Sequence, residues 1–226
     1  MTTLRNVAKF GIELEGGWDT APRDHRCYKG DSSVHVPGSW RVGEIVSPIL
    51  TDWQTGSDFI FVNYPDHTGA SCGLHVHMSF AESRAENAYR VALLADSENF
   101  QTGLLERLST VAKSLKITSK AFWERLRGEN SYCRPVWSDR NVRESDRYRA
   151  VNFAAYARHS TVEIRMLPMF SKRQISARMV REVLTFTDGY LGSVIAADRL
   201  TPAAAEFVAP ATALEDHNDI IEREIV

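Results

Sequence analysis

Hydrophobic and polar residues alternate along four short segments that lie far apart in the chain. These segments are Lys9–Glu15, Val42–Ser47, Gly73–Phe80 and Thr161–Met166. Alternation with a period of two is typical of a β-strand that buries one face, so each segment predicts a strand. The stretches between the first three strands, residues 16–39 and 51–70, are rich in turn-forming residues and predict loops.

Apolar residues recur at helical spacing in the longer segments between and after the strands. Residues 83–115 and the segment Lys120–Arg127 show this spacing, and Gly128 is a typical C-terminal cap for the second segment. After the last strand, the apolar residues of the range 175–194 form one stripe. This stripe predicts a helix that covers the sheet.

The order of these elements indicates the fold class. Strands that are far apart in the chain, with helices inserted between them, favour an α+β fold over regularly alternating βαβ units. We expect an antiparallel or mixed sheet. No repeat, linker or change of composition divides the chain, so we expect a single domain over residues 1–226, in which residues 201–226 form a peripheral C-terminal helical tail.

Composition and charge exclude several classes of protein. The 226 residues are 43% hydrophobic, which is enough for an ordinary core, and the net charge of -2 gives no general attraction to nucleic acid or to an anionic membrane. No apolar run reaches the roughly 20 residues that span a bilayer, and residues 1–9 lack a signal-peptide pattern, so we expect a cytoplasmic protein without a membrane partner. The widely spaced Cys27, Cys72 and Cys133 predict reduced thiols that serve in packing.

The polar side of the predicted strands carries carboxylates and imidazoles. Residues two apart in a strand point the same way, and three pairs therefore share a face: Glu13 with Glu15, His75 with His77, and Glu163 with Arg165. Glu44 comes from the second strand and is the least secure member, because Val42 and Val46 share its face. One interpretation is a solvated face of an antiparallel sheet, where such alternation is ordinary.

The other interpretation is a divalent-cation site. Glutamates with an imidazole suit Mg²⁺ or Mn²⁺, whereas a structural Zn²⁺ site usually recruits cysteines. Such cations accompany phosphates, and an arginine beside them stabilises the transferred phosphoryl group. Arg165 fits that role, although a salt bridge to a neighbouring carboxylate explains it equally well. The chain has no GxxxxGK[ST] or GxGxxG motif, which argues against a P-loop, kinase or Rossmann nucleotide site.

Five short segments carry most of these polar residues. They are Phe10–Glu15 (FGIELE), Glu44–Pro48 (EIVSP), Cys72–Met78 (CGLHVHM), Tyr148–Asn152 (YRAVN) and Thr161–Arg165 (TVEIR). In this order they resemble the amidoligase branch of the glutamine synthetase and glutamate–cysteine ligase superfamily. Asp31–Ser33 matches the acidic turn of that family before its second strand. The resemblance implies a curved, mainly antiparallel sheet with helices on its convex face and the nucleotide on its concave face.

The resemblance also implies an activity. It predicts a carboxylate–amine ligase that uses ATP and Mg²⁺ (or Mn²⁺) to join a small-molecule or peptide carboxylate to an amine through an acyl phosphate. By analogy with glutamine synthetase, Glu13, His75 and Glu163 would hold the cation between the β- and γ-phosphates, and Glu15 with Glu44 would hold a second cation. Four further residues would bind the phosphates or the substrate carboxylate: His77, Arg149, Asn152 and Arg165. The two arginines are the candidate catalytic residues.

A basic stretch follows the predicted helices. Seven arginines lie between residues 125 and 149, and guanidinium groups suit bidentate capture of carboxylate or phosphate. The stretch therefore suits an acidic peptide, a nucleic acid or a nucleic-acid-linked substrate. We favour a solvated loop for most of these arginines and a binding role for Arg149, with Arg134 as a second candidate.

Two alternatives to a ligase remain open from the sequence. The first is a cupin, a metal-dependent oxygenase or isomerase, because His75, His77 and Glu82 fit the first half of its metal motif. Tyr89 then replaces the closing glycine, and no later strand supplies the second histidine motif. A His-x-His amidohydrolase barrel is weaker still, since such barrels have roughly 250 residues. The second alternative is a non-catalytic module that binds a ligand, a peptide or nucleic acid.

Overall fold

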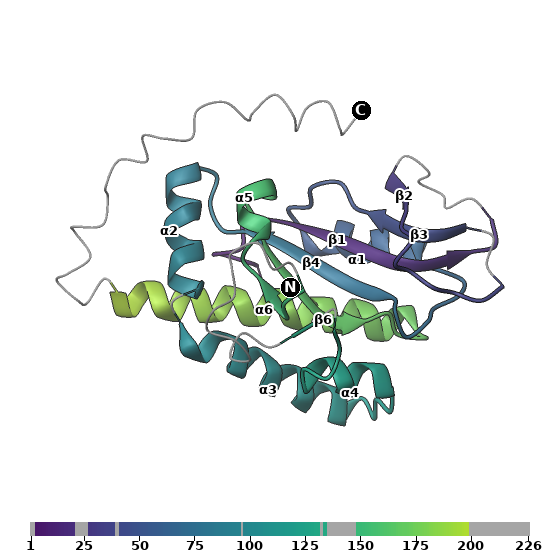
Figure 1. Cartoon of the computed structure of the whole chain (residues 1–226). Coiled ribbons are helices and arrows are strands. Elements are labelled where there is room, and N and C mark those ends of the chain that lie inside the picture. Colours follow the sequence, from purple (N-terminus) through teal and green to yellow (C-terminus); the bar gives the residue numbers. More distant parts are fainter. Residues whose placement is uncertain are drawn as a thin grey trace.

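The chain folds as an open antiparallel sheet with helices, which confirms the α+β class (Figure 1). The computed structural model describes residues 3–20, 27–38, 41–95, 97–131, 133–134 and 148–198, so the predicted tail at 201–226 lies outside the described residues. The strands are β1 (Lys9–Trp18), β2 (Tyr28–Gly30), β3 (Arg41–Val46), β4 (Gly73–Ser79), β5 (Val151–Asn152) and β6 (Val162–Pro168). The helices are α1 (Trp53–Asn63), α2 (Arg84–Ala95), α3 (Glu98–Ser114), α4 (Lys120–Leu126), α5 (Ala155–His159) and α6 (Arg173–Asp198).

The sheet has the strand order β2-β3-β1-β4-β6-β5, and every pairing is antiparallel. All four predicted strands are present. The alternation seen in the sequence is also present, because Ile12, Val76 and Ile164 are fully buried in one hydrophobic core. The alternate residues of the same strands face the other side of the sheet.

Helix α6 covers the apolar side of the sheet, as its stripe predicts. Figure 1 shows it running along the sheet, and it packs against α1, α2, α3 and β4. Met179, Val183 and Leu191 on this helix have no exposed surface and belong to the same core as the strands. Burial of each such side chain contributes about 1.5–3 kcal/mol, so this long helix is a major part of the core. Among the helices of the described residues, none combines the length and the apolar character needed to span a bilayer.

Helix α1 corrects the prediction of a loop over residues 51–70. Gly, Ser and Asp in this segment have low helix propensity, but tertiary contacts outweigh it. Asp52 caps the helix by accepting a hydrogen bond from the Thr55 N–H at 2.8 Å. Gly56 packs against Phe10, and a Cβ at this position would lie 2.9 Å from Cε2 of that ring. The glycine that weakens the sequence signal is therefore the residue that lets α1 approach β1.

Helix α4 ends as the sequence predicts. Gly128 has a φ of +72° and its N–H donates to the Arg125 carbonyl at 3.1 Å, which is the expected glycine C-terminal cap. Ser119 caps the start of the helix by accepting from the Phe122 N–H. These two ends fix a helix of under two turns against β6 and place Arg125 in the interior. Cys72 and Cys133 are buried free thiols, as expected for packing residues.

Candidate functional site

Strand register brings the predicted polar residues together on the face opposite the core. In β1 and β4, Glu13 lies directly across from His75. In β4 and β6, His77 lies across from Glu163. On the other side of β1, Glu15 lies across from Glu44. Because a one-residue slip would move a strand's whole polar set to the core face, the buried apolar face fixes this alignment.

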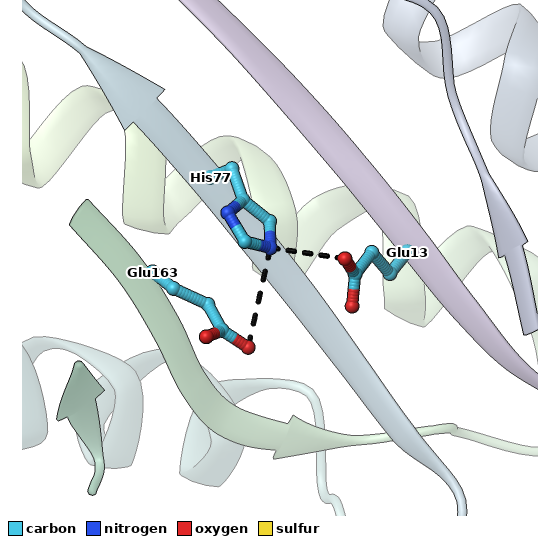
Figure 2. Close-up of side chains that lie close together, drawn as sticks. All are labelled: Glu13, His77 and Glu163. Carbon is cyan, nitrogen blue, oxygen red and sulfur yellow. Dashed lines mark ion pairs between the residues drawn. The ribbon is translucent and has the colours of Figure 1, made fainter. Parts of the chain in front are cut away.

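The first group consists of Glu13, His77 and Glu163, which Figure 2 shows converging from three neighbouring strands. One ligand atom of each lies within 4.8 Å of the others. His77 Nε2 is 3.1 Å from Glu13 Oε1 and 4.0 Å from Glu163 Oε1. The opposite ring nitrogen, Nδ1, is hydrogen-bonded to Thr161 Oγ1 at 3.1 Å. Thr161 therefore holds the imidazole with Nε2 directed between the two carboxylates.

The second group consists of Glu15, Asp31 and Glu44, whose carboxylates also approach within 4.8 Å of one another. Glu15 accepts a hydrogen bond from the Gly73 N–H. Asp31 accepts two hydrogen bonds from Ser33, one from its N–H and one from its hydroxyl, both at 2.7 Å. These contacts orient two of the three carboxylates and leave oxygens of each available.

His75 lies between the two groups. Its Nδ1 is 3.0 Å from Glu13 Oε2 and 3.4 Å from Glu163 Oε1, and its Nε2 is 3.7 Å from Glu15 Oε1. The ring is almost fully buried. It fits there only because residue 73 is glycine, since a Cβ at Gly73 would overlap His75 Nε2. The imidazole therefore links the carboxylates of both groups.

The electrostatics of the site divide its carboxylates into two kinds. Burial alone would raise the pKa of Glu13, but hydrogen bonds with His75 and His77 outweigh burial and hold that pKa well below its ordinary value. Burial and the charges of neighbouring carboxylates, Glu13 first, raise the pKa of Glu44 to about 7. Burial would lower the pKa of His77, but its contact with Glu13 raises it. Glu44 is therefore the carboxylate whose charge the fold opposes.

The donor set suits a hard divalent cation. Carboxylate oxygens with one imidazole nitrogen are the ligands expected for Mg²⁺ or Mn²⁺. Asn152, which is 3% exposed, donates from Nδ2 to Glu163 Oε2 at 2.6 Å. Its Oδ1 is buried and has no hydrogen-bond partner among the described residues. A buried carbonyl oxygen of this kind is costly unless something satisfies it, and a bound cation or a water on that cation would do so.

Both groups line one cavity of about 470 Å³, a size typical of small-molecule sites. Three arginines, Arg125, Arg158 and Arg165, also line it, together with Tyr148 and a wall of helix α5 that includes His159. Arg165 donates to Glu163, so the salt-bridge interpretation of Arg165 and its place in the cavity both hold. The cavity thus combines carboxylates and guanidinium groups.

Most of the predicted site residues meet in this cavity. Glu13, Glu15, Glu44, Glu163 and the two histidines all line it, as do Asn152 and Arg165. Their roles as ligands stay predictions. The group around Glu13 and Glu163 contains His77, where the prediction named His75, and His75 occupies the buried position between the two groups.

Arg149 lies elsewhere. It forms a β-bridge with Arg134 and is not among the described residues that line the cavity. Its candidate catalytic role therefore lacks support from the geometry, because a catalytic arginine must reach the reacting group. The other arginines of the basic stretch at 140, 143 and 147 lie outside the described residues.

Sequence reasoning assigned no site role to several residues in or beside the cavity: Asp31, Arg125, Arg158 and His159 line it, and Thr161 contacts His77. Asp31 enters the second group from a short turn after β2, and only its match to a family turn signalled it. Arg125 belongs to the basic stretch, for most of which a solvated loop was favoured, and Thr161 is an ordinary strand threonine, so neither was predicted as a site residue. Thr161 is the first residue of the predicted strand and lies on the same face as Glu163, and that parity was the one available clue.

Comparisons of the chain with protein-family models, with curated proteins and with solved structures give no match.

Proposed function

We propose that this chain is an ATP- and Mg²⁺-dependent carboxylate–amine ligase with a glutamine-synthetase-like fold. The observation that carries the proposal is the convergence of two ligand groups on one sheet face, one around Glu13 and Glu163 and one around Glu15 and Glu44, beside arginines in one cavity. The five segments that resemble the amidoligases supply the strands that bear these residues. Chemistry of the site and resemblance of the sequence therefore point to the same reaction.

The residues present fit two cations and a triphosphate. Glu13, His77 and Glu163 would hold one cation, and Glu15, Asp31 and Glu44 would hold the second. A bound Mg²⁺ would neutralise the charge that develops on the transferred phosphoryl group. Asn152 and Arg165 keep Glu163 in place through hydrogen bonds. Arg165 also adds positive charge beside that carboxylate, where the phosphoryl group would be transferred.

The proposed reaction has two steps. An oxygen of the substrate carboxylate forms a bond to the γ-phosphorus while the bond between that phosphorus and its bridging oxygen breaks, which gives an acyl phosphate and ADP. The amine nitrogen then forms a bond to the acyl carbon, and inorganic phosphate leaves with the electron pair of the broken C–O bond. A carboxylate near the amine accepts the proton that the amine loses.

The cupin alternative finds less support in this fold. A cupin needs a jelly roll of two packed sheets, whereas the described strands form a single open sheet with β2 and β5 at its edges. Glu82, the third residue of the motif, pairs with Lys9 at 2.6 Å and its side chain is 72% exposed. It is not among the described residues that line the cavity. The ligase therefore remains the better proposal for the two histidines.

The test measures Mg²⁺-dependent binding of a non-hydrolysable ATP analogue by titration calorimetry. Wild-type protein should bind the analogue with Mg²⁺ and not with EDTA. Glu13→Gln and Glu163→Gln should each weaken binding by at least about a hundredfold, because each removes a charged ligand. Glu82→Gln, which removes a carboxylate outside the cavity, is the matched control and should bind as wild type. Metal-independent binding, or wild-type binding in both cavity variants, refutes the assignment.

A second experiment tests the reaction itself. Protein, ATP and Mg²⁺ are incubated with mixtures of carboxylates and amines, and release of ADP is followed. The expected result is ADP release that requires both a carboxylate and an amine. ADP release with neither, or with the amine alone, would contradict an acyl-phosphate ligase.

A further inference from the structure

Arg125 is a buried arginine whose hydrogen-bond acceptors are backbone carbonyls. Arg125 lies on the short helix α4 and is 2% exposed. Nη1 donates to the Arg165 carbonyl at 3.2 Å, and Nη2 donates to the Ser71 and Cys72 carbonyls at 3.4 Å each. These bonds tie α4 to the middle of β6 and to the residues just before β4. They are long for hydrogen bonds from a charged donor.

Arg125 has no carboxylate partner among the described residues that would balance its charge. Several other arginines in the described part of the chain have carboxylate partners: Arg165 pairs with Glu163, Arg127 with Glu129, and Arg107 with Glu182. No carboxylate among the described residues forms an ion pair with Arg125. Its Nε is buried without a hydrogen-bond partner there. A buried charge without a counter-ion is strongly unfavourable.

The position of Arg125 indicates where the missing anion would come from. Arg125 lines the same cavity as the two carboxylate groups. Burial lowers the pKa of Arg125, and the nearby Cys133 and then the charge of Glu15 act against that shift. An arginine remains charged at neutral pH all the same. The cavity therefore holds one guanidinium that a ligand anion could compensate.

We propose that Arg125 is the anion-binding contact of this cavity and receives the carboxylate of the substrate through charge-assisted hydrogen bonds that include Nε. The carboxylate identity rests on the proposed function, whereas the anion subsite itself rests only on Arg125 and its surroundings. A phosphoryl group presents the same oxyanion chemistry, and separate probes distinguish the two sources. An arginine that only braces α4 against the strands would leave its Nε unaffected by either anion.

The direct test observes the arginine Nε–H signals of the uniformly ¹⁵N-labelled wild-type chain by NMR. Glutarate and inorganic phosphate are added separately, each with Mg²⁺ present. The Arg125 Nε–H signal should shift with glutarate and reach a plateau, while the exposed Arg127 Nε–H should stay in place. A shift with phosphate alone overturns the carboxylate assignment. An unmoved Arg125 signal with both anions, up to their solubility limits, overturns the subsite.

Variants give a second, independent measure. Arg125→Gln should weaken glutarate binding by about tenfold to a hundredfold, the range for a hydrogen bond to a charged group. Arg125→Lys keeps the charge and should lose less. Arg127→Gln, which removes a charge two residues away, should bind as wild type. Equal glutarate affinity in folded Arg125→Gln and wild type overturns the proposal; if circular dichroism shows that neither Arg125 variant folds, the wild-type NMR titration decides.

The two proposals can fail separately. If wild type does not bind the nucleotide analogue but its Arg125 signal shifts saturably with glutarate, the ligase proposal is refuted and the anion subsite stands. If wild type binds the nucleotide analogue with Mg²⁺ but its Arg125 signal does not move, the anion subsite is refuted and the ligase proposal stands.

Discussion

Replacing Glu44 by glutamine should stabilise the cation-free protein above neutral pH. The fold holds Glu44 where burial, and then the charges of Glu13, Glu15 and Asp31, raise the pKa of this carboxylate from 4.5 to about 7. In the unfolded chain the same group titrates near its ordinary value. The folded protein therefore binds more protons than the unfolded chain over this pH window. Its stability must fall as the pH rises through it.

The size of the effect follows from the shift. Below about pH 4 the group is protonated in both the folded and the unfolded state, so its raised pKa does not change the free energy of unfolding. Above about pH 7 it is ionised in both states, and the reduction in the free energy of unfolding is largest. The full shift corresponds to about 3 kcal/mol of unfolding free energy. Glu44 is partly exposed, so solvent screening reduces this to about 1–2 kcal/mol. Glutamine keeps the shape of the side chain and removes the charge.

Urea unfolding in EDTA measures this difference. At about pH 8, Glu44→Gln should have an unfolding free energy about 1–2 kcal/mol above that of wild type, and at about pH 4.5 the two should agree within error. Glu106→Gln, an exposed glutamate on α3, is the control and should show no such pH dependence. A variant that is less stable than wild type at the higher pH would refute the electrostatic reasoning.

Magnesium should reverse the order of stabilities. A cation that binds only the folded state stabilises it by mass action, and wild type has the third carboxylate of the second group that the variant lacks. Saturating Mg²⁺ should therefore raise the melting temperature of wild type more than that of Glu44→Gln. Equal shifts in both proteins would mean that Glu44 is not a ligand. A site that destabilises its own fold without its ligand is a common property of functional residues.

Two further substitutions test the packing around His75 and the anchoring of the N-terminal segment. Gly73→Ala should displace His75, since a Cβ would overlap its Nε2, and should weaken Mg²⁺ binding about tenfold or more. Gly30→Ala, where a Cβ meets nothing within 4 Å, should bind Mg²⁺ as wild type in the same calorimetric titration. Asp188→Leu should lower the unfolding free energy by about 2 kcal/mol in urea, because Asp188 Oδ1 accepts three N–H bonds from residues 5–7 at 2.6–3.0 Å. Unchanged stability would show that the N-terminal segment is not held by this carboxylate.

The strands and much of the cavity could be predicted because sheet residues obey a short rule. Parity along each strand separates core residues from site residues, so Glu13 and Glu163 could be placed on one face without any knowledge of pairing. Helix α1 could not be predicted, since Gly56 has value only when Phe10 lies against it. Local propensity contains no information about such a contact.

Within the site, too, some residues could be predicted from the sequence and others, such as Asp31 and Arg125, could not. The carboxylates of Glu15 and Glu44 meet because their strands pair in register, and a period of two in the sequence already indicates which way each points. Asp31 joins them from a turn, and Arg125 reaches the cavity from a helix. The direction of those side chains depends on how α4 and the turn pack against the sheet. Site residues that come from a sheet face are therefore predictable from sequence, whereas the groups that complete the cavity from other elements become visible only in three dimensions.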